Sequence, residues 1–243
     1  MTEKKILFIV NPVAGSGDNT SLRSELEQAC HERTYRMFYR ETTGADDARM
    51  LRENLRELEP DVVVVCGGDG TVNLVGRELL GTSIPLCILP CGSANGLATE
   101  LGLSEDPSFC LDLLEKGRVV EMDVVVIDSE HLCFHLADLG TNARLVQDFE
   151  NRSVRGNWGY LLSFIGGIFD RHESKAIIQL PEKKLALEVE MVALANARMY
   201  GTGAILNPGG RLDDGQFELC LFRPVPRHHI LKVALAFFTG GLK

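Results

Sequence analysis

The N-terminal part of the chain alternates short apolar runs with amphipathic stretches, which predicts strands that are each followed by a helix. The apolar runs, short enough for buried strands, are residues 5–10, 37–40, 62–66 and 84–89. The stretches with apolar side chains at helical spacing are residues 20–33, 42–58 and 71–80. Repeated strand–helix units favour a parallel sheet with helices on both faces, so we expect a three-layer α/β domain.

The pattern changes near residue 118, where strand-like alternation continues without helices between the strands. Strands are predicted at residues 119–128, 131–140, 176–180, 186–197 and 217–223. Helical spacing returns at residues 158–171 and 228–238. Consecutive strands of this kind predict an antiparallel β-sandwich domain. We therefore expect an α/β domain over residues 1–122 and a β-rich domain over residues 123–243.

Composition narrows the functional classes. The net charge of −9 argues against a broad nucleic-acid surface. The seven cysteines show no zinc-type spacing, which favours reduced thiols and a cytoplasmic location. The first apolar run is too short for a signal peptide, and no stretch approaches the roughly 18 apolar residues of a membrane span.

Three turns of small and polar residues follow predicted strands. The residues in them that we single out as candidates for ligand binding are Asn11, Pro12, Gly15, Gly67, Gly68, Asp69, Gly70, Thr71, Asn73, Ser93 and Asn95. In a parallel sheet, turns that follow strand ends meet at one edge, where open α/β sheets bind ligands. A single glycine turn is usually only a turn, but three of them predict a ligand site.

The second turn, Gly-Gly-Asp-Gly-Thr at 67–71, has the chemistry of a polyphosphate site. Its glycines leave backbone amides uncovered, and Thr71 can begin a helix whose N-terminus attracts anions. Asp69 is a carboxylate among these amides, an unfavourable place unless a cation or a hydroxyl proton is handled there. The combination suggests phosphoryl transfer from a nucleotide.

The three motifs together, NPxAG, GGDGT followed by Asn, and PxGSAN, resemble the diacylglycerol kinase catalytic-domain family. That family includes bacterial soluble lipid kinases and sphingosine kinases, and it is related to NAD kinases and phosphofructokinases. The resemblance extends to Gly140, Asn196 and residues 203–219. It implies an ATP-dependent lipid kinase that transfers the γ-phosphate to a hydroxyl of a diacylglycerol-like lipid, which it would meet at a membrane surface.

The resemblance also implies roles for individual residues. Asn11, Pro12, Gly15 and Thr42 would face the nucleotide. Residues 67–73 would wrap the phosphates, with Ser93 and Asn95 completing the third motif. Asp69 would be the catalytic carboxylate, either holding Mg²⁺ on the phosphates or orienting a hydroxyl. The structural alternatives are a turn-forming Asp69 and a capping or turn-supporting role for Asn73 and Asn95.

A second metal position is implied in the loop Arg-Leu-Asp-Asp-Gly-Gln at 211–216. In the bacterial relatives a structural Mg²⁺ is bound there by one Asp side chain and two main-chain carbonyls. The matching residues are Asp214 for the side chain, and Arg211 and Gln216 for the carbonyls. Oxygen ligands suit Mg²⁺. The alternative is that Asp-Asp-Gly is a hairpin turn before the next strand.

The chain departs from the family in two respects. It contains no Asp-Gly-Glu, the motif that carries the expected general base. We therefore expect either a truncated kinase with an unfinished β domain or a non-catalytic nucleotide-binding member, and the abrupt C-terminus favours truncation. Asn142 replaces an acid and disfavours an amine-bearing sphingoid substrate. An NAD kinase is a remote alternative, and the pattern is compatible with a homodimer and with peripheral membrane attachment.

Overall fold

A computed structural model describes residues 3–15, 19–92, 95–140, 174–200, 203 and 205–223. The chain divides into an N-terminal unit, Met1–Glu121, and a C-terminal unit, Met122–Lys243. The helices predicted at 158–171 and 228–238 lie outside the described residues.

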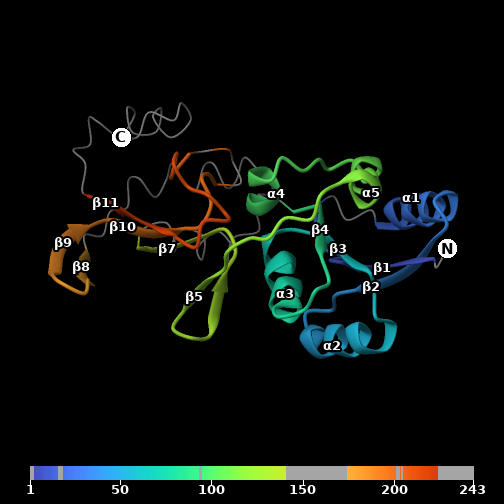
Figure 1. The fold of residues 1–243 in the computed structure, drawn as a ribbon, viewed down its shortest axis with the longest axis horizontal. Coiled ribbons are helices and arrows are strands. Elements are labelled where there is room, and N and C mark those ends of the chain that lie inside the picture. The colour runs from blue at the N-terminus through green and yellow to red at the C-terminus, as the bar shows by residue number, and fades with distance from the viewer. Residues whose placement is uncertain are drawn as a thin grey trace. The chain divides into compact units, whose positions relative to one another are not determined.

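The N-terminal unit is built on a four-stranded parallel sheet with the order β2-β1-β3-β4 (Figure 1). Its strands are β1 (Lys4–Val10), β2 (Tyr35–Glu41), β3 (Val62–Gly67) and β4 (Leu86–Pro90). The pairs Val10–Cys66 and Gly67–Pro90 end the register, so the carboxyl ends of β1, β3 and β4 lie along one edge. The predicted α/β architecture is confirmed.

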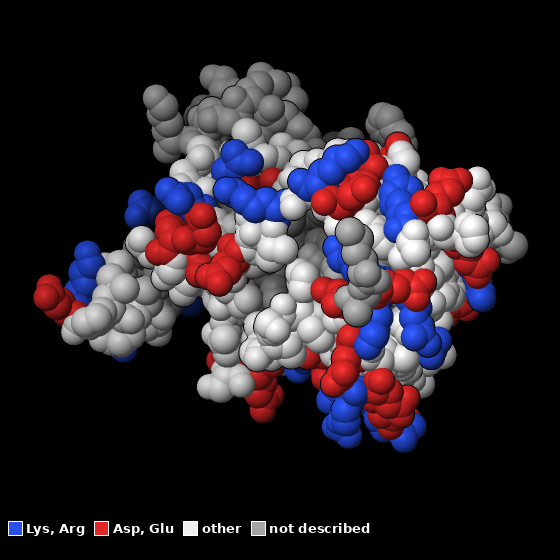
Figure 2. All heavy atoms as spheres, turned by 45° about the vertical axis from the view of Figure 1, so that its right-hand side comes forward, with Lys and Arg blue, Asp and Glu red and all other residues white. Residues whose placement is uncertain are grey.

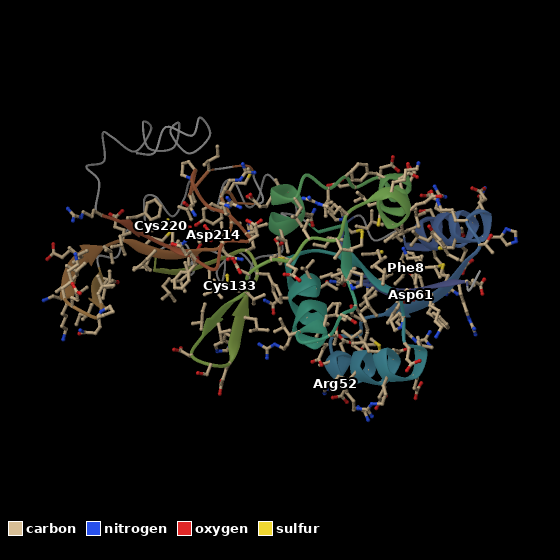
Figure 3. All side chains as sticks on the ribbon, viewed as in Figure 1. Phe8, Arg52, Asp61, Cys133, Asp214 and Cys220 are labelled. Carbon is tan, nitrogen blue, oxygen red and sulfur yellow. The ribbon has the colours of Figure 1, made fainter. Side chains whose placement is uncertain are left out.

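Helices cover both faces of this sheet. They are α1 (Asn19–Glu32), α2 (Asp47–Leu58), α3 (Asp69–Leu79), α4 (Gly96–Glu100) and α5 (Pro107–Lys116). Helices α1 and α5 lie on one side of the sheet, and α2 and α3 lie on the other (Figure 1). An ion pair of 2.8 Å between Arg52 on α2 and Glu78 on α3 joins the second pair (Figure 3 labels Arg52).

Burial follows from the sequence of the central strands. Residues 6–10 of β1 and 62–66 of β3 are all apolar and all buried, as expected for parallel strands covered on both faces. Alternate side chains point to opposite faces. Phe8 and Val64 therefore lie in one core cluster with Leu26 of α1 and Leu111 of α5 (Figure 3 labels Phe8). This packing holds the strand ends in fixed positions.

The C-terminal unit contains antiparallel sheets, as the second half of the fold prediction required. Strands β7 (Leu136–Gly140), β10 (Met191–Ala195) and β11 (Glu218–Phe222) form one sheet in the order β11-β10-β7. Two hairpins pair β5 (Val125–Ile127) with β6 (His131–Cys133), and β8 (Ser174–Gln179) with β9 (Lys184–Val189).

Two predicted strands are each broken in two, so their prediction as single strands was wrong. The segment 131–140 divides into β6 and β7, and 186–197 divides into β9 and β10, with the halves in different sheets. The first break has a clear cause. Asn196 donates its side-chain amide to the Phe134 carbonyl at 3.0 Å, and its main-chain amide bonds the His135 carbonyl at 3.1 Å. These bonds turn the chain where alternation alone predicted continuity.

None of the helices in the described ranges is long and apolar enough to span a bilayer. Charged side chains of both signs are interleaved on the face that Figure 2 shows.

Candidate functional site

The predicted nucleotide-facing residues follow the strand ends of the N-terminal unit. Main-chain hydrogen bonds extend the ladder by one residue past β1, β2 and β4. The Asn11 amide donates to the Cys66 carbonyl at 2.9 Å, and the Thr42 amide donates to the Val10 carbonyl at 2.8 Å. The Cys91 amide donates to the Gly67 carbonyl at 3.0 Å. All three predicted turns and Thr42 are therefore fixed at one edge of the sheet.

Asn11 links the first turn to the start of α3. Its side-chain carbonyl accepts from the Val13 amide at 3.1 Å, which fixes the turn that contains half-buried Pro12. Its side-chain amide lies 3.4 Å from the Thr71 hydroxyl oxygen, across from the second turn. The Thr71 side chain is buried, so this contact lies at the base of the site.

Glycines allow the three turns to touch. A Cβ on Gly15, which has a φ of 63°, would lie 2.7 Å from the Cys91 carbonyl oxygen. A Cβ on Gly92 would lie 2.5 Å from the Cα of Gly68. Both distances are shorter than any side-chain carbon tolerates. The first and second turns therefore each pack directly against the third.

Gly67 and Gly70 differ in what their missing side chains would meet. A Cβ on Gly67 would lie 2.6 Å from the Thr71 hydroxyl, whereas one on Gly70 would meet nothing within 4 Å. Gly70 and Asp69 are exposed, and they are the first residues of α3. The first amides of a helix have no helical partner. The start of α3 is therefore an open position whose amides could bind an anion, above a tightly packed base.

Asp69 bonds to a segment that sequence reasoning did not connect with it. Its carboxylate accepts from the Gly96 amide at 2.7 Å and from the Leu97 amide at 3.1 Å, the first two amides of α4. It therefore caps α4 from 27 residues away, and it does not form the local turn that we considered as the alternative. A carboxylate has about four acceptor sites. After these two bonds, Asp69 can still accept from a hydroxyl or bind a cation.

Asn95 supports the third turn. Its side chain accepts from the Gly92 amide and donates to the Gly92 carbonyl, both at 2.8 Å. It is buried, with a φ of 49°, a left-handed conformation that asparagine tolerates better than most residues. These bonds favour the turn-supporting role over direct ligand contact. Asn73 is half-buried on α3, and Ser93 lies outside the described residues.

The loop at 211–216 of the C-terminal unit is held by its own carboxylates and by one further residue. Asp214 accepts from the Gln216 amide at 3.0 Å, and Arg211 bonds Asp213 at 3.1 Å (Figure 3 labels Asp214). Asp123, which sequence reasoning missed, accepts from the Gly215 amide at 2.6 Å. Its own amide donates to the Leu212 carbonyl at 2.6 Å.

These contacts bear on the predicted Mg²⁺ position. The described residues hold no group of three or more His, Cys, Asp or Glu side chains that is placed to bind a metal ion. The predicted site needs only one such side chain, and the loop supplies Asp214, with Asp123 beside it, together with main-chain carbonyls. This oxygen-only donor set fits Mg²⁺. The sequence signal for Asp123 was weak, because a single Asp before an apolar run has no distinguishing spacing.

Comparison with known proteins decides the family. Residues 5–127 match the family model for the diacylglycerol kinase catalytic domain, which is half of the chain. The chain belongs to the diacylglycerol kinase catalytic-domain family. The predicted resemblance is therefore confirmed, and a lipid kinase role in general follows for this chain.

Individual relatives of this diacylglycerol kinase family member agree with the match. A probable lipid kinase YegS-like from Yersinia pestis (strain Pestoides F) is 29% identical over 206 residues, which cover 81% of this chain and 68% of that protein. A protein of the same name from Yersinia pseudotuberculosis matches to the same extent. Among solved structures, a diacylglycerol kinase from Bacillus anthracis has a TM-score of 0.75 at 23% identity, covering 100% of this chain and 79% of that one. A putative diacylglycerol kinase from the same organism has a TM-score of 0.77 at 22% identity, covering 81% of that chain. The two structures establish the fold.

Proposed function

We propose that the protein is an ATP-dependent lipid kinase that transfers the γ-phosphate to a hydroxyl of a diacylglycerol-like lipid. One observation carries the proposal: three turns pack into one cluster beneath the exposed start of α3. The Asp69 carboxylate at that start is fixed by its hydrogen bonds to α4. Phosphoryl transfer depends mainly on positioning and on charge stabilisation. A rigid cradle of amides with one oriented carboxylate provides both for a nucleotide.

The residues divide into two groups in this proposal. The amides of Asp69 and Gly70 would bind phosphate oxygens, and Asn11 and Thr42 would border the nucleotide. The Asp69 carboxylate, held by α4, would keep its remaining acceptor positions directed at the reacting groups. Mg²⁺, when bound, would neutralise phosphate charge. A second, structural Mg²⁺ would be held by Asp214 and by the carbonyls of Arg211 and Gln216.

The acceptor is proposed from the family alone. The diacylglycerol-like lipid would be met at a membrane surface, and Asn142, which bears on the choice of lipid, lies outside the described residues. The competing candidate is a nucleotide-binding member without transfer activity, which the absence of Asp-Gly-Glu from the sequence favours. The same assay separates the two.

The test is transfer of labelled γ-phosphate from ATP to diacylglycerol dispersed in detergent micelles. We expect labelled lipid with the wild-type chain and a loss of roughly 100-fold or more with Asp69→Asn, the size seen when one positioned electrostatic group is removed. Asp112→Asn is the matched control, because Asp112 is an exposed carboxylate on α5 that pairs with Arg33. It should keep its activity.

Two results would count against the proposal. If the wild-type chain binds ATP and labels no lipid, the proposed transfer activity of this chain is wrong. If Asp69→Asn turns over like the wild type, Asp69 has no part in transfer. Urea unfolding of each variant, measured alongside, separates lost transfer from lost folding. We expect Asp69→Asn to remain folded, because the Asn side chain keeps one oxygen to cap α4.

A further inference from the structure

Two cysteine side chains meet between the edge of the sheet and α5. Cys87 lies on β4, the edge strand, and Cys110 lies on α5, which packs on the same strand. Their sulfur atoms are 3.5 Å apart. A disulfide bond is about 2.04 Å long, so an approach of roughly 1.5 Å would join them. The contact joins residues from two separate elements and is independent of the turns described above.

The two thiols have unequal environments. Hydrogen bonding from Cys110 lowers the pKa of Cys87, and the Ile88 amide and the Lys4 ammonium group act in the same direction against the effect of burial. The same contact, together with burial, raises the pKa of Cys110. Cys87 is also half-buried, whereas Cys110 is buried. Since the thiolate is the nucleophilic form, Cys87 is the thiol that reacts first with an oxidant.

We propose that Cys87 and Cys110 are a redox modification site that closes to a reversible disulfide in the presence of hydrogen peroxide. The Cys87 thiolate attacks the peroxide, so that a sulfur–oxygen bond forms, the oxygen–oxygen bond breaks and the leaving oxygen departs as water after protonation. The Cys110 sulfur then attacks the Cys87 sulfur and its thiol proton passes to the departing hydroxyl, so that the sulfur–sulfur bond forms, the sulfur–oxygen bond breaks and the oxygen leaves as a second water. Two thiols lose two electrons, and one peroxide gains them.

Neighbouring cysteines are less suited to this reaction. Cys66 is fully buried in β3, and burial raises its pKa well above the ordinary value. Cys91 directs its sulfur at the Leu89 carbonyl oxygen, 3.4 Å away, and burial raises its pKa as well. Geometry and reactivity therefore both select the pair of Cys87 and Cys110.

The disulfide would enclose residues 88–109. This loop contains the third turn, with Gly92 and Asn95, and α4, whose first amides bind Asp69. Closing the loop restricts the motions of the segment that, on the proposed function, borders the nucleotide. The chemistry itself does not depend on that function.

The experiment treats the full chain with hydrogen peroxide and digests it, under alkylating conditions, with a protease that cuts after Glu. Glu100 and Glu105 lie between the two cysteines, so Cys87 and Cys110 fall on separate peptides. Cys87 shares its peptide with Cys91, so fragmentation of the cross-linked peptide by tandem mass spectrometry assigns the bonded sulfur. We expect a cross-link between those peptides and the loss of two of the seven thiols, both reversed by dithiothreitol. A cross-link from Cys110 to Cys66 or Cys91, or oxidation without any cross-link, would overturn the proposal.

Two variants sharpen the result. Cys110→Ser keeps a hydrogen-bond donor beside Cys87 and should leave Cys87 as a sulfenic acid that dimedone captures. Cys91→Ala should form the cross-link as the wild type does. Loss of the cross-link in Cys91→Ala, with the fold intact by circular dichroism, would also overturn the proposal. The wild-type peptide map decides alone if a variant does not fold. No nucleotide or lipid is present, so this test and the kinase assay fail or succeed separately.

Discussion

Gly92 and Asp69 hold the candidate site together in opposite ways. Gly92 contributes by having no side chain, because its Cα approaches Gly68 where two turns touch. Asp69 contributes a carboxylate that reaches the first amides of α4. One residue permits close packing and the other satisfies buried polar groups, and both effects depend on neighbours distant in sequence.

Gly92→Ala should lower the free energy of unfolding by about 1–3 kcal/mol, the usual cost of overpacking. The added Cβ would lie 2.5 Å from the Gly68 Cα and 2.8 Å from the Asn95 side-chain oxygen, and the first of these is backbone that cannot turn away. Gly70→Ala is the matched control, since its Cβ meets nothing within 4 Å. It should change stability by less than about 0.5 kcal/mol in the same urea titration. Equal losses in both variants would show that the contact does not limit packing.

At the residue scale, the sequence predicted which residues lie together in the candidate site, but it did not predict their hydrogen-bond partners. Asn11, Gly67 and Asn95 were identified because each follows an apolar run, and strand ends converge in a parallel sheet. The partners of Asp69 were not predicted, because α4 is short and no pattern ties residue 96 to residue 69. Asn196 was noted only through the resemblance, yet its side chain decides where a strand ends.

At the scale of elements, hydrogen bonds at the helix starts stabilise the fold. At the start of α2, Asp47 accepts from the Thr43 and Gly44 amides, each at 2.8 Å. Partial burial alone would raise the pKa of Asp47, but the hydrogen bonds from Thr43 and Gly44 outweigh it and hold this pKa below its ordinary value. The ionised form therefore stabilises the folded state.

The ionisation of Asp47 makes the free energy of unfolding depend on pH. A carboxyl with a depressed pKa in the folded state contributes stability above its unfolded pKa, near 3.9, and loses it as the pH falls through the lower folded value. Asp47→Asn should therefore cost about 0.5–1 kcal/mol at pH 7 and nearly nothing at pH 2. Urea titrations across this range measure the difference. Asp46→Asn, an exposed carboxylate without a capping bond, should show a much smaller pH-dependent difference.

The loop at 211–216 gives a second test at the level of elements. If it binds Mg²⁺, the metal should raise the midpoint of thermal unfolding by about 3 °C at tenfold excess over its dissociation constant. Asp214→Asn should abolish the shift, whereas Asp213→Asn should keep it, because Asp213 pairs with Arg211. An equal shift in both variants would place the metal elsewhere.

Strand boundaries show why some elements could not be predicted. Alternation of apolar and polar residues continues through Phe134–His135 and through Glu190, so pattern alone predicts single long strands. The chain turns there because main-chain groups find partners on other segments, such as Asn196 and Phe222. Long-range hydrogen bonds of this kind leave no periodic signal, whereas the buried helices and strands of the N-terminal unit do.

At the scale of the whole molecule, each unit has its own core. Val64 lies in the large cluster of the N-terminal unit, and a smaller cluster around Ala193, Ala195, Tyr200 and Leu206 serves the C-terminal unit. Damage to one core should therefore remain largely within its unit.

Val64→Ala tests this separation. Val64 is fully buried, so the change should cost about 2 kcal/mol and raise amide exchange rates in β1 and β3 roughly 30-fold. Exchange in β10 should remain at the wild-type rate. Val126→Ala, at a position 58% exposed on β5, should leave both regions unchanged. Equal acceleration in β10 would mean that the two units unfold as one.

The strand order has a consequence for synthesis on the ribosome. Strand β1 lies inside the sheet between β2 and β3 and precedes both of them in the sequence, so both its neighbours are translated after it. Five consecutive apolar residues of β1 therefore remain without a partner until residues 35–41 emerge, and one edge stays open until residues 62–67 follow. During that interval the nascent chain exposes an apolar segment of the kind that chaperones bind. Strand β1 is thus paired on both sides only after both of its neighbours in the sheet have been translated.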